Sequence, residues 1–297
     1  MIPDKSVNLI VIDPPYNIGI KGASWDKYSK EEYLKFMSGV FTECHRVLKD
    51  NGSFYWFHND MQQIAQLMTW LDENSSFVFN SFVTWDKGDW RALSWKNPSD
   101  ESNLRSWFNT CEYLFYYSKP EEIDDIKQYL ISEKKKSGLT LLEINQLFGI
   151  QISDGIAKRY FGNSQWELPT REKYEIMQTT GYWKKPYDEL KSAFDNARAV
   201  HHVDPNHNNV WRYKTENSGK YHACQKPLTV IERIIKSSSN ESDIVLDCFM
   251  GSGTTAVAAT RLSRKFIGFE RESEYVQIAN QRLEAIIDSQ ADRKLTE

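Results

Sequence analysis

The feature that most constrains this chain is an apolar segment that stops abruptly at two prolines. Residues Val7–Ile12 form a mainly apolar run that predicts a buried strand. Asp13-Pro14-Pro15-Tyr16 follows directly. Two consecutive prolines prevent helix continuation and remove two backbone N–H donors. The strand must therefore end in a stiff, extended turn whose carbonyl groups stay free to accept hydrogen bonds.

This turn has the chemistry to hold a planar heterocycle that carries an exocyclic amine. The Asp13 carboxylate and the Pro14 carbonyl could accept hydrogen bonds from an amino group, and the Tyr16 ring offers a flat face for stacking. Adenine and cytosine are heterocycles of this kind. In an arbitrary chain the same tetrapeptide is about as often an ordinary surface turn, so a second signal has to decide.

The second signal is a glycine turn in the C-terminal part of the chain. Ser242–Cys248 predicts another buried strand, and Phe249–Ala256 follows it with Gly251 and Gly253. A helical stretch comes next, which gives the strand, glycine turn and helix of a nucleotide-binding unit. Glu270 ends the following apolar stretch, at about the distance where such folds place a carboxylate for ribose hydroxyl groups.

These two segments, in this order, resemble the beta group of amino-methylating DNA methyltransferases, in which the catalytic half precedes the cofactor half. The resemblance implies an α/β fold: a Rossmann-like class I methyltransferase sheet with permuted motif order. It covers residues 1–119 and the part from about residue 221 onward. Further short segments that share it are Glu43–Lys49, Gly52–Tyr55, Cys111–Lys119 and Gln225–Leu228.

Hydrophobic periodicity divides the chain into three parts. Residues 1–119, the catalytic half, and residues 200–297, the cofactor half, alternate predicted strands and helices, which favours βαβ units and a largely parallel sheet. Residues 120–199 predict an all-helical insert. In the first part we expect strands at Val7–Ile12, Ser53–Phe57, Phe77–Trp85 and Glu112–Tyr117, and helices at Glu31–Leu48 and Met61–Leu71.

The insert resembles a helix-turn-helix domain of the phage-repressor type. A helix that reaches Phe148 is ended by Gly149, a second helix spans Ser153–Phe161, and Leu168-Pro169-Thr170 opens a third. The second would be the recognition helix of a domain that recognises the target DNA. A plain helical bundle is the alternative. The predicted DNA contacts are Lys158, Arg159, Asn163, Ser164 and Gln165.

Charge does not decide between these alternatives. From Lys119 to Ala199 there are thirteen Lys and Arg residues and thirteen Asp and Glu residues. A neutral insert that binds DNA would have to concentrate its lysines on one face, for instance Lys134–Lys136 with Lys184 and Lys185. The net charge of −4 for the 297 residues likewise argues against a whole surface that coats nucleic acid.

Other composition signals exclude several classes of protein. The four cysteines show no metal-ligand spacing, and the loop with His201, His202, Asp204 and His207 fits no common metal site, so no metal is expected. No apolar run approaches membrane-spanning length, and the N-terminus does not resemble a signal peptide. We expect a cytoplasmic, nucleoid-associated protein of a prokaryote or phage, without membrane contact.

The resemblance also implies a reaction, the transfer of a methyl group from S-adenosylmethionine to the 6-amino group of adenine in double-stranded DNA. Asp13, Pro14, Pro15 and Tyr16 would be catalytic. The base would be flipped out of the duplex and methylated by direct in-line transfer. The cofactor would be bound by Asp247, Phe249, Gly251, Gly253, Thr254, Glu270 and Lys226.

Several alternatives stay open. Adenine is favoured over the 4-amino group of cytosine because cytosine enzymes more often carry Ser in place of Asp13. A catalytically impaired helix-turn-helix DNA-binding protein is the rival from another class. The glycine turn with Glu270 also fits a nicotinamide-dependent dehydrogenase, although few residues follow it. A homodimer and a cognate restriction endonuclease are open as partners.

The N-terminus departs from the family pattern. Members of this group usually carry another short strand, ending in Gly-Asp, just before the Asp-Pro-Pro-Tyr strand, and it contacts the adenine of the cofactor. The sequence begins at Met1-Ile2-Pro3-Asp4, which leaves no room for such a strand. We therefore expect either a start that is assigned too late or a cofactor site with an incomplete adenine pocket.

Overall fold

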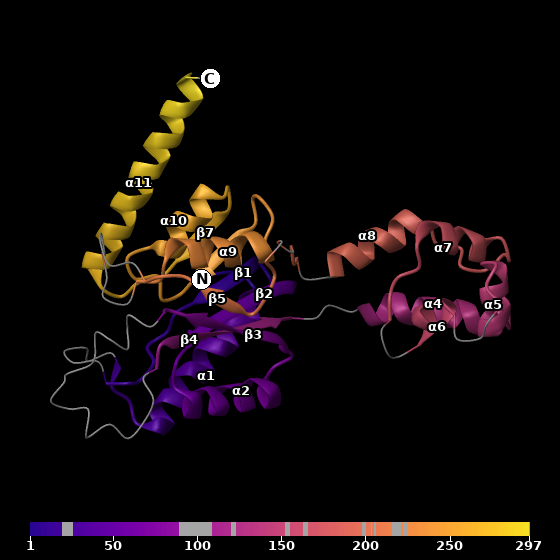
Figure 1. The fold of residues 1–297 in the computed structure, drawn as a ribbon, viewed down its shortest axis with the longest axis horizontal. Helices are drawn as coiled ribbons and strands as arrows, with labels where there is room; N and C mark the ends of the chain where they lie inside the picture. The colour runs from indigo at the N-terminus through magenta and orange to yellow at the C-terminus, as the bar shows by residue number, and fades with distance from the viewer. Residues whose placement is uncertain are drawn as a thin grey trace. The chain divides into compact units, whose positions relative to one another are not determined.

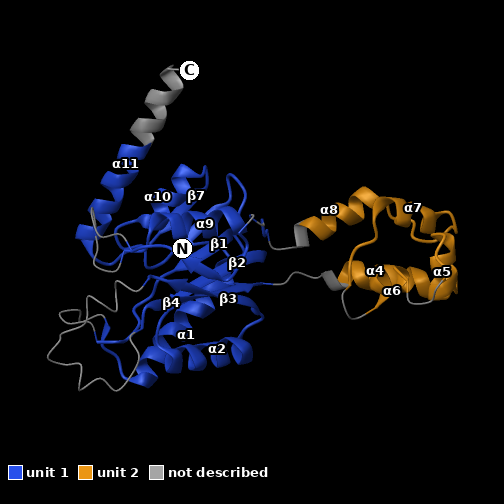
Figure 2. Cartoon of the chain, in the orientation of Figure 1, with its two compact units in different colours: residues 1–119, 199–297 blue, residues 120–198 orange. Residues whose placement is uncertain are grey.

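The computed structural model describes residues 1–19, 26–88, 109–119, 123–151, 155–162, 166–197, 200–202, 204, 206–215, 221 and 225–296. The chain divides into two compact units (Figure 2). The larger unit comprises residues 1–119 and 199–297, and the helical unit comprises residues 120–198.

The larger unit is built on a seven-stranded sheet with the order β5-β3-β4-β2-β1-β6-β7 (Figure 1). Strand β4 runs antiparallel to β2 and β3, and the other described strand pairs are parallel. The predicted α/β fold with a largely parallel sheet is confirmed. The strands are β1 (Val7–Ile12), β2 (Leu48–His58), β3 (Val78–Asp86), β4 (Cys111–Ser118), β5 (Val210–Arg212), β6 (Ile244–Asp247) and β7 (Lys265–Gly268).

Helices cover both faces of this sheet. Helices α1 (Lys30–Val47) and α2 (Met61–Asn74) lie on one face, and α9 (Leu228–Ser238) and α10 (Thr254–Arg261) lie on the other (Figure 1). Alternate residues of the central strands pack toward the two sides, which explains their nearly continuous apolar sequence. Ile10, Ile12, Phe54 and Trp56 face α1 and α2, whereas Leu9, Val11, Tyr55 and Phe57 face α9 and α10.

The predicted boundary between the first helix and the second strand is wrong. The helix expected to reach Leu48 ends at Val47, and β2 begins at Leu48 instead of Ser53. Leu48 already pairs with Val7 of β1 and is fully buried, so tertiary pairing extends the strand into a stretch with helical periodicity. The last helix, α11 (Ser273–Thr296), follows β7.

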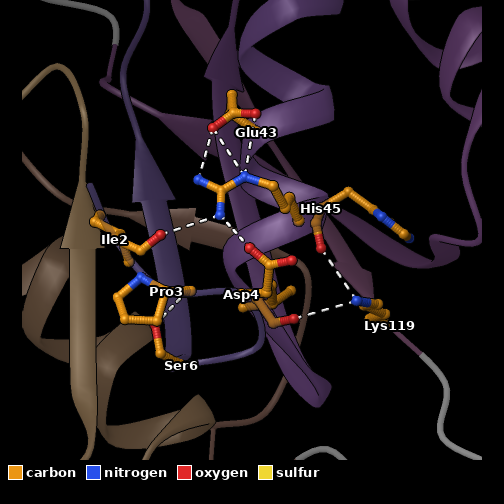
Figure 3. Close-up of polar contacts among 9 residues, drawn as sticks. Ile2, Pro3, Asp4, Ser6, Glu43, His45 and Lys119 are labelled. Atoms are coloured by element: carbon orange, nitrogen blue, oxygen red, sulfur yellow. Dashed lines mark hydrogen bonds and ion pairs between the residues drawn. The ribbon is translucent and has the colours of Figure 1, made fainter.

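The segment before β1 is tied to α1, and α1 is tied in turn to the residue that follows β4 (Figure 3). Arg46 of α1 donates to the Ile2 carbonyl at 3.0 Å and forms an ion pair with Asp4. Ser6 donates to the Pro3 carbonyl at 2.7 Å. Lys119, which follows β4, donates to the His45 carbonyl at 3.1 Å. These contacts fix the position at which β1 enters the sheet.

The helical unit has its own hydrophobic core, which includes Leu130, Ile144, Tyr160, Tyr174 and Trp183. Its described elements are all helices. A capping box at Thr140 begins α5, and Gly149, with a φ of +76°, follows this helix. The helices are α4 (Ile123–Ser137), α5 (Leu141–Leu147), α6 (Ala157–Phe161), α7 (Arg171–Gln178) and α8 (Tyr187–Ala197).

The expected recognition helix is shorter than predicted. Helix α6 begins at Ala157 instead of Ser153, which lies outside the described residues. The Asn145 side chain of α5 accepts a hydrogen bond from the Ala157 N–H at 3.0 Å and satisfies a donor that a helix start leaves unpaired. A long-range contact, invisible in local sequence, therefore sets the helix boundary.

The glycine turn between β6 and α10 requires left-handed backbone at two positions. Gly251 has a φ of +51° and Gly253 a φ of +81°. A Cβ atom at Gly253 would lie 2.7 Å from the Cβ of Ala279, whereas one at Gly251 would meet nothing within 4 Å. The two glycines thus share a conformational role, but only Gly253 is also required by close packing against α11.

These contacts predict different costs for the same substitution at the two glycines. Gly251→Ala should lower the free energy of unfolding by roughly 1–2 kcal/mol, because only the left-handed conformation penalises it. Gly253→Ala should cost more, because the added methyl also forces α10 and α11 apart. Urea unfolding of both variants measures this, and equal costs would contradict the role of the Ala279 contact.

Candidate active site

The Asp13-Pro14-Pro15-Tyr16 turn lies at the carboxyl end of β1 and is held by side chains from α1 and α2. Tyr33 donates to the Pro15 carbonyl at 2.6 Å, and Gln63 donates to the Tyr16 carbonyl at 3.0 Å. In the described part of the chain, the Pro14 carbonyl has no hydrogen-bond donor. The turn is therefore rigid and keeps one free acceptor next to the Asp13 carboxylate.

A buried histidine supports the turn from β2. His58 is fully buried, and burial lowers its pKa to about 4, so it is neutral near pH 7. The Asp60 N–H donates to His58 Nδ1 at 3.1 Å, which places the ring proton on Nε2. That Nε2 lies 2.9 Å from the Tyr33 hydroxyl, so His58 donates to the tyrosine that holds Pro15.

Both oxygens of the Asp13 carboxylate are engaged by donors of the protein itself. The Tyr16 hydroxyl donates to Oδ1 at 2.6 Å, and the Lys226 ammonium donates to Oδ2 at 2.5 Å. Lys226 comes from the segment just before α9, in the C-terminal part of the chain. The two parts of the sequence thus meet at this carboxylate.

Asp13 belongs to a buried charge cluster with Lys226, Glu112 and Lys87. Glu112 Oε2 lies 3.2 Å from Lys226 Nζ and 3.3 Å from the Tyr16 hydroxyl, and its other oxygen pairs with Lys87. Burial opposes ionisation of Glu112, but the charges of Lys226 and Lys87 outweigh it and lower its pKa to about 2. Two carboxylates and two ammonium groups therefore balance each other in a desolvated site.

The cluster controls the charge states of Tyr16 and Lys226. Burial and the negative charges of Asp13 and Glu112 raise the pKa of Tyr16 well above its usual value, so its hydroxyl stays protonated. Burial alone would lower the pKa of Lys226, but Asp13 and Glu112 raise it above its usual value. Lys226 is therefore a permanent cation at neutral pH.

Aromatic rings enclose the Lys226 ammonium. It lies 5.3 Å from the centre of the Tyr16 ring and 5.0 Å from that of Phe57. The Tyr16 ring is 9% exposed and also packs on His58, with ring centres 4.8 Å apart. The predicted stacking of Tyr16 on a substrate ring stays a prediction, because neighbouring groups cover much of this ring.

Two carboxyl groups with different environments lie beside the glycine turn. Asp247 is buried and accepts hydrogen bonds from the Phe249 N–H at 2.9 Å and the Thr255 hydroxyl at 2.6 Å. Burial raises its pKa to about 7 despite these bonds. Glu270 is partly exposed, and its Oε2 accepts from the Gly251 N–H at 2.9 Å.

The predicted cofactor residues therefore divide into two groups. Lys226 lies in the buried charge cluster beside Asp13. The others gather around the β6–α10 turn and the end of β7: Asp247, Phe249, Gly251, Gly253, Thr254 and Glu270. Strands β1 and β6 are parallel neighbours, so both groups lie at the same edge of the sheet.

The predicted DNA contacts are in the helical unit. Lys158 and Arg159 are exposed on α6, and Arg159 lies 3.7 Å from Glu167. Asn163, Ser164 and Gln165 lie outside the described residues. Their contribution to DNA binding remains a prediction.

Sequence reasoning missed Glu112 and Lys87. Glu112 opens an otherwise apolar strand, and a buried carboxylate requires a partner, so its position carries a signal. The identity of the partners could not be read, because Lys87 follows β3 and Lys226 is distant in sequence. Only the antiparallel direction of β4 brings Glu112 to the edge where β1 and β3 end.

The described residues also bear on metal binding and on membrane-spanning helices. No group of three or more His, Cys, Asp or Glu side chains among them is arranged to hold a metal ion. His201 and His207 do approach each other, with 2.9 Å between their Nε2 atoms. No helix in the described part of the chain has the length and apolar character needed to cross a membrane.

Comparison with known sequences identifies a matching family and similar methyltransferases. A model of a DNA methylase family, designated N6_N4, matches residues 7–281. The Type II methyltransferase M1.MboII of Moraxella bovis is 32% identical over 289 residues, which cover 94% of this chain and 90% of that protein. The Type II methyltransferase M.BglII of Bacillus subtilis is 30% identical, and the match covers 94% of this chain but 64% of that protein.

Solved structures share the fold. PvuII DNA methyltransferase, described as cytosine-N4-specific, aligns with a TM-score of 0.55 at 15% identity, over 94% of this chain and 80% of that one. M1.HpyAVI in complex with SAM aligns with a TM-score of 0.50 at 22% identity, over 94% of this chain and 89% of that one. The sheet of the larger unit is therefore that of a class I methyltransferase.

The raised pKa of Asp247 predicts a distinctive pH dependence of stability. The unfolded chain ionises this group near pH 3.8, whereas the folded protein keeps its proton up to about pH 7. Its contribution is thus complete below about pH 4 and is lost as the pH rises to 7. Relative to Asp247→Asn, the wild-type free energy of unfolding should fall by a few kcal/mol across this window.

Urea unfolding at several pH values measures this difference. The exposed Asp72→Asn serves as the matched control and should follow the wild type. Parallel curves for the wild type and Asp247→Asn would show that the Asp247 carboxyl group is ionised in the folded protein throughout this range.

Proposed function

Because the chain belongs to the DNA methylase family whose model matches residues 7–281, we propose that it methylates the 6-amino group of adenine in DNA. The broader class is site-specific amino methyltransferases that act on adenine N6 or cytosine N4. S-adenosylmethionine is the methyl donor. The relatives named as Type II methyltransferases favour a role in restriction and modification.

The observation that carries this proposal is the position of Asp13 beside the free Pro14 carbonyl. An exocyclic amine on adenine is a poor nucleophile because its lone pair is delocalised into the ring. Two acceptors that bind the two amine protons would localise that lone pair and direct it toward the methyl group of the cofactor. The Asp13 carboxylate would also stabilise positive charge that develops on the nitrogen.

The residues around the glycine turn fit the cofactor. Gly251 leaves open space where a side chain would project, and the N-terminus of α10 presents backbone N–H groups. Glu270 is oriented by the Gly251 N–H for ribose hydroxyl groups, and Asp247 would face the positively charged methionine portion. When bound, S-adenosylmethionine supplies a methyl group activated by a sulfonium centre.

Binding of the target amine would bring a competing donor to the Asp13 carboxylate. Lys226 and Tyr16 occupy its two oxygens, and both donors also lie within 3.2–3.3 Å of Glu112 Oε2. When the amine binds Asp13, Glu112 would keep both donors satisfied. We therefore propose Glu112 as a positioning residue that makes Asp13 available.

The helical unit is proposed to recognise the target DNA. It would use α6 in a helix-turn-helix arrangement, with contacts from Lys158, Arg159, Asn163, Ser164 and Gln165. The duplex buries the target amine in a base pair, so the enzyme would flip the nucleotide out at a cost of a few kcal/mol. A catalytically impaired DNA-binding protein is the competing proposal, and the pair of acceptors at Asp13 and Pro14 argues against it.

The function and the choice of base are tested together. The purified protein is incubated with duplex DNA and labelled S-adenosylmethionine, and the DNA is digested to nucleosides. N6-methyl-2′-deoxyadenosine as the product supports the proposal. N4-methyl-2′-deoxycytidine would move the protein to the other substrate, and no transfer to DNA would contradict an active enzyme.

Asp13→Ala should abolish most methyl transfer and leave cofactor binding largely intact. The carboxylate is a charged acceptor in a desolvated site, so its loss should raise the barrier by roughly 2–4 kcal/mol, about two to three decades in rate. Single-turnover kinetics and calorimetric titration with S-adenosylmethionine measure the two quantities. A variant with near wild-type rate would remove Asp13 from the mechanism.

Glu112→Gln should lower kcat by about tenfold or more, because Lys226 then stays on Asp13 when the amine arrives. Without Glu112 the pKa of Lys226 falls relative to the wild type. The kcat of the variant should therefore recover at high pH, where neutral Lys226 releases Asp13. Lys87→Met/Glu112→Gln, which removes one charge of each sign, controls for charge balance. A uniform loss at every pH would indicate a merely structural role.

A further inference from the structure

A lysine-lined pocket lies within the helical unit, between the end of α4 and the segment that joins α7 to α8. Its volume is about 280 Å³. Tyr129, Glu133 and Lys136 line it from α4, and Gly181, Tyr182, Lys184 and Lys185 line it from the connecting segment. Three lysines against one glutamate leave a surplus of two positive charges in a unit with balanced charge.

The single acidic group of the pocket is already committed to internal contacts. Glu133 accepts a hydrogen bond from Lys136 at 2.5 Å and another from the Trp183 N–H at 3.2 Å. Its pKa is lowered chiefly by the hydrogen bond from Lys136. In the described residues, no hydrogen bond or ion pair engages the Lys184 ammonium. Lys185 lies 3.9 Å from Glu189, a loose contact between two exposed groups.

The backbone that carries Lys184 and Lys185 is strained and firmly held. Gly181 has a φ of +85° and Trp183 a φ of +52°, which is rare for a bulky residue. The fully buried Trp183 ring donates to the Leu130 carbonyl at 3.3 Å, and Gln178 donates to the Trp183 carbonyl at 2.8 Å. Strained backbone of this kind gathers at ligand sites, where the surroundings maintain it.

Tyr129 forms the wall of the pocket beside Lys185. Tyr129 accepts a hydrogen bond from the Lys185 N–H at 3.0 Å, and its ring lies 5.0 Å from the Lys185 ammonium. The volume falls just below the range of small-molecule sites, about 300–1,000 Å³. The pocket therefore suits a single phosphodiester group with its water rather than a whole nucleotide.

We infer that this lysine pocket binds a backbone phosphate of the substrate DNA. The inference rests on the proposed function, because DNA is the polyanion that the enzyme must hold. It places a phosphate contact of the helical unit at Lys184 and Lys185, outside the predicted recognition helix α6. Contacts to phosphates position a protein on the duplex without reading its sequence.

The test compares two variants of the full chain that lose the same charge. Lys184→Gln/Lys185→Gln removes the two charges of the connecting segment and keeps the first two methylene groups of each side chain. Lys127→Gln/Lys191→Gln removes two lysines from α4 and α8 that do not line the pocket. Fluorescence anisotropy then measures binding to a target duplex and a non-target duplex of equal length, at several salt concentrations.

The pocket variant should bind both duplexes at least tenfold more weakly near 0.1 M salt. Its slope of log affinity against log salt should be shallower by about two, about one for each lost phosphate contact. The control variant should keep the wild-type slope. Equal losses in both variants, an unchanged pocket variant, or a loss confined to the target duplex would each overturn the inference.

A different result would contradict the proposed function. If the wild type transfers no methyl group to DNA, the enzyme assignment is wrong whatever the variants do. If the wild type methylates and binds DNA while the pocket variant binds as tightly as the wild type, only the phosphate site is wrong.

Discussion

The larger unit depends on one constraint, that the buried charges of Asp13 and Glu112 must be neutralised by lysines. Leaving such a charge unpaired costs about 3–5 kcal/mol, a large part of the stability of a typical domain. Lys226 contacts both carboxylates and Lys87 contacts Glu112. The end of β1, the start of β4, the residue after β3 and the segment before α9 must therefore meet at one place. The charges of this cluster thus hold the two halves of the sequence together.

The glycine turn between β6 and α10 differs from this charge cluster in how its neighbouring carboxyl groups are held. Backbone N–H groups, rather than lysines, orient its carboxyl groups: Phe249 binds Asp247, and Gly251 binds Glu270. Among the described residues no cation pairs with Asp247 as Lys226 pairs with Asp13, so nothing outweighs the burial that raises its pKa to about 7. A positively charged ligand would supply the missing partner. The pairing of β1 with β6 places this turn at the same edge of the sheet as the buried charge cluster.

The helical unit differs from the larger unit in its core and in the arrangement of its charges. It folds around its own core and carries balanced charge, so its electrostatic character depends on where the lysines lie. The buried Trp183 and the committed Glu133 leave Lys184 and Lys185 around one pocket. In a unit with twelve Lys and Arg residues against thirteen Asp and Glu residues, this local surplus is the means by which a polyanion could be held. A local surplus of this kind does not appear in the charge balance of the sequence, so that balance carries no information about DNA binding.

The sequence by itself determined the apolar strands, the turn at Pro14 and Pro15 and the glycine turn, because these depend on local sterics and hydrophobic periodicity. It placed Asp13 and Glu270 at strand ends and therefore predicted the α/β fold and the edge of the sheet that carries the site. Only the tertiary structure decided that Lys226 and Tyr16 each contact both Asp13 and Glu112. Strand order and the antiparallel direction of β4 cannot be predicted from the local sequence pattern. The tertiary structure likewise decided that α6 begins at Ala157, because the capping group comes from Asn145 on another helix. Local signals fix where elements end, whereas the partners of buried charges and helix caps depend on which distant segments pack together.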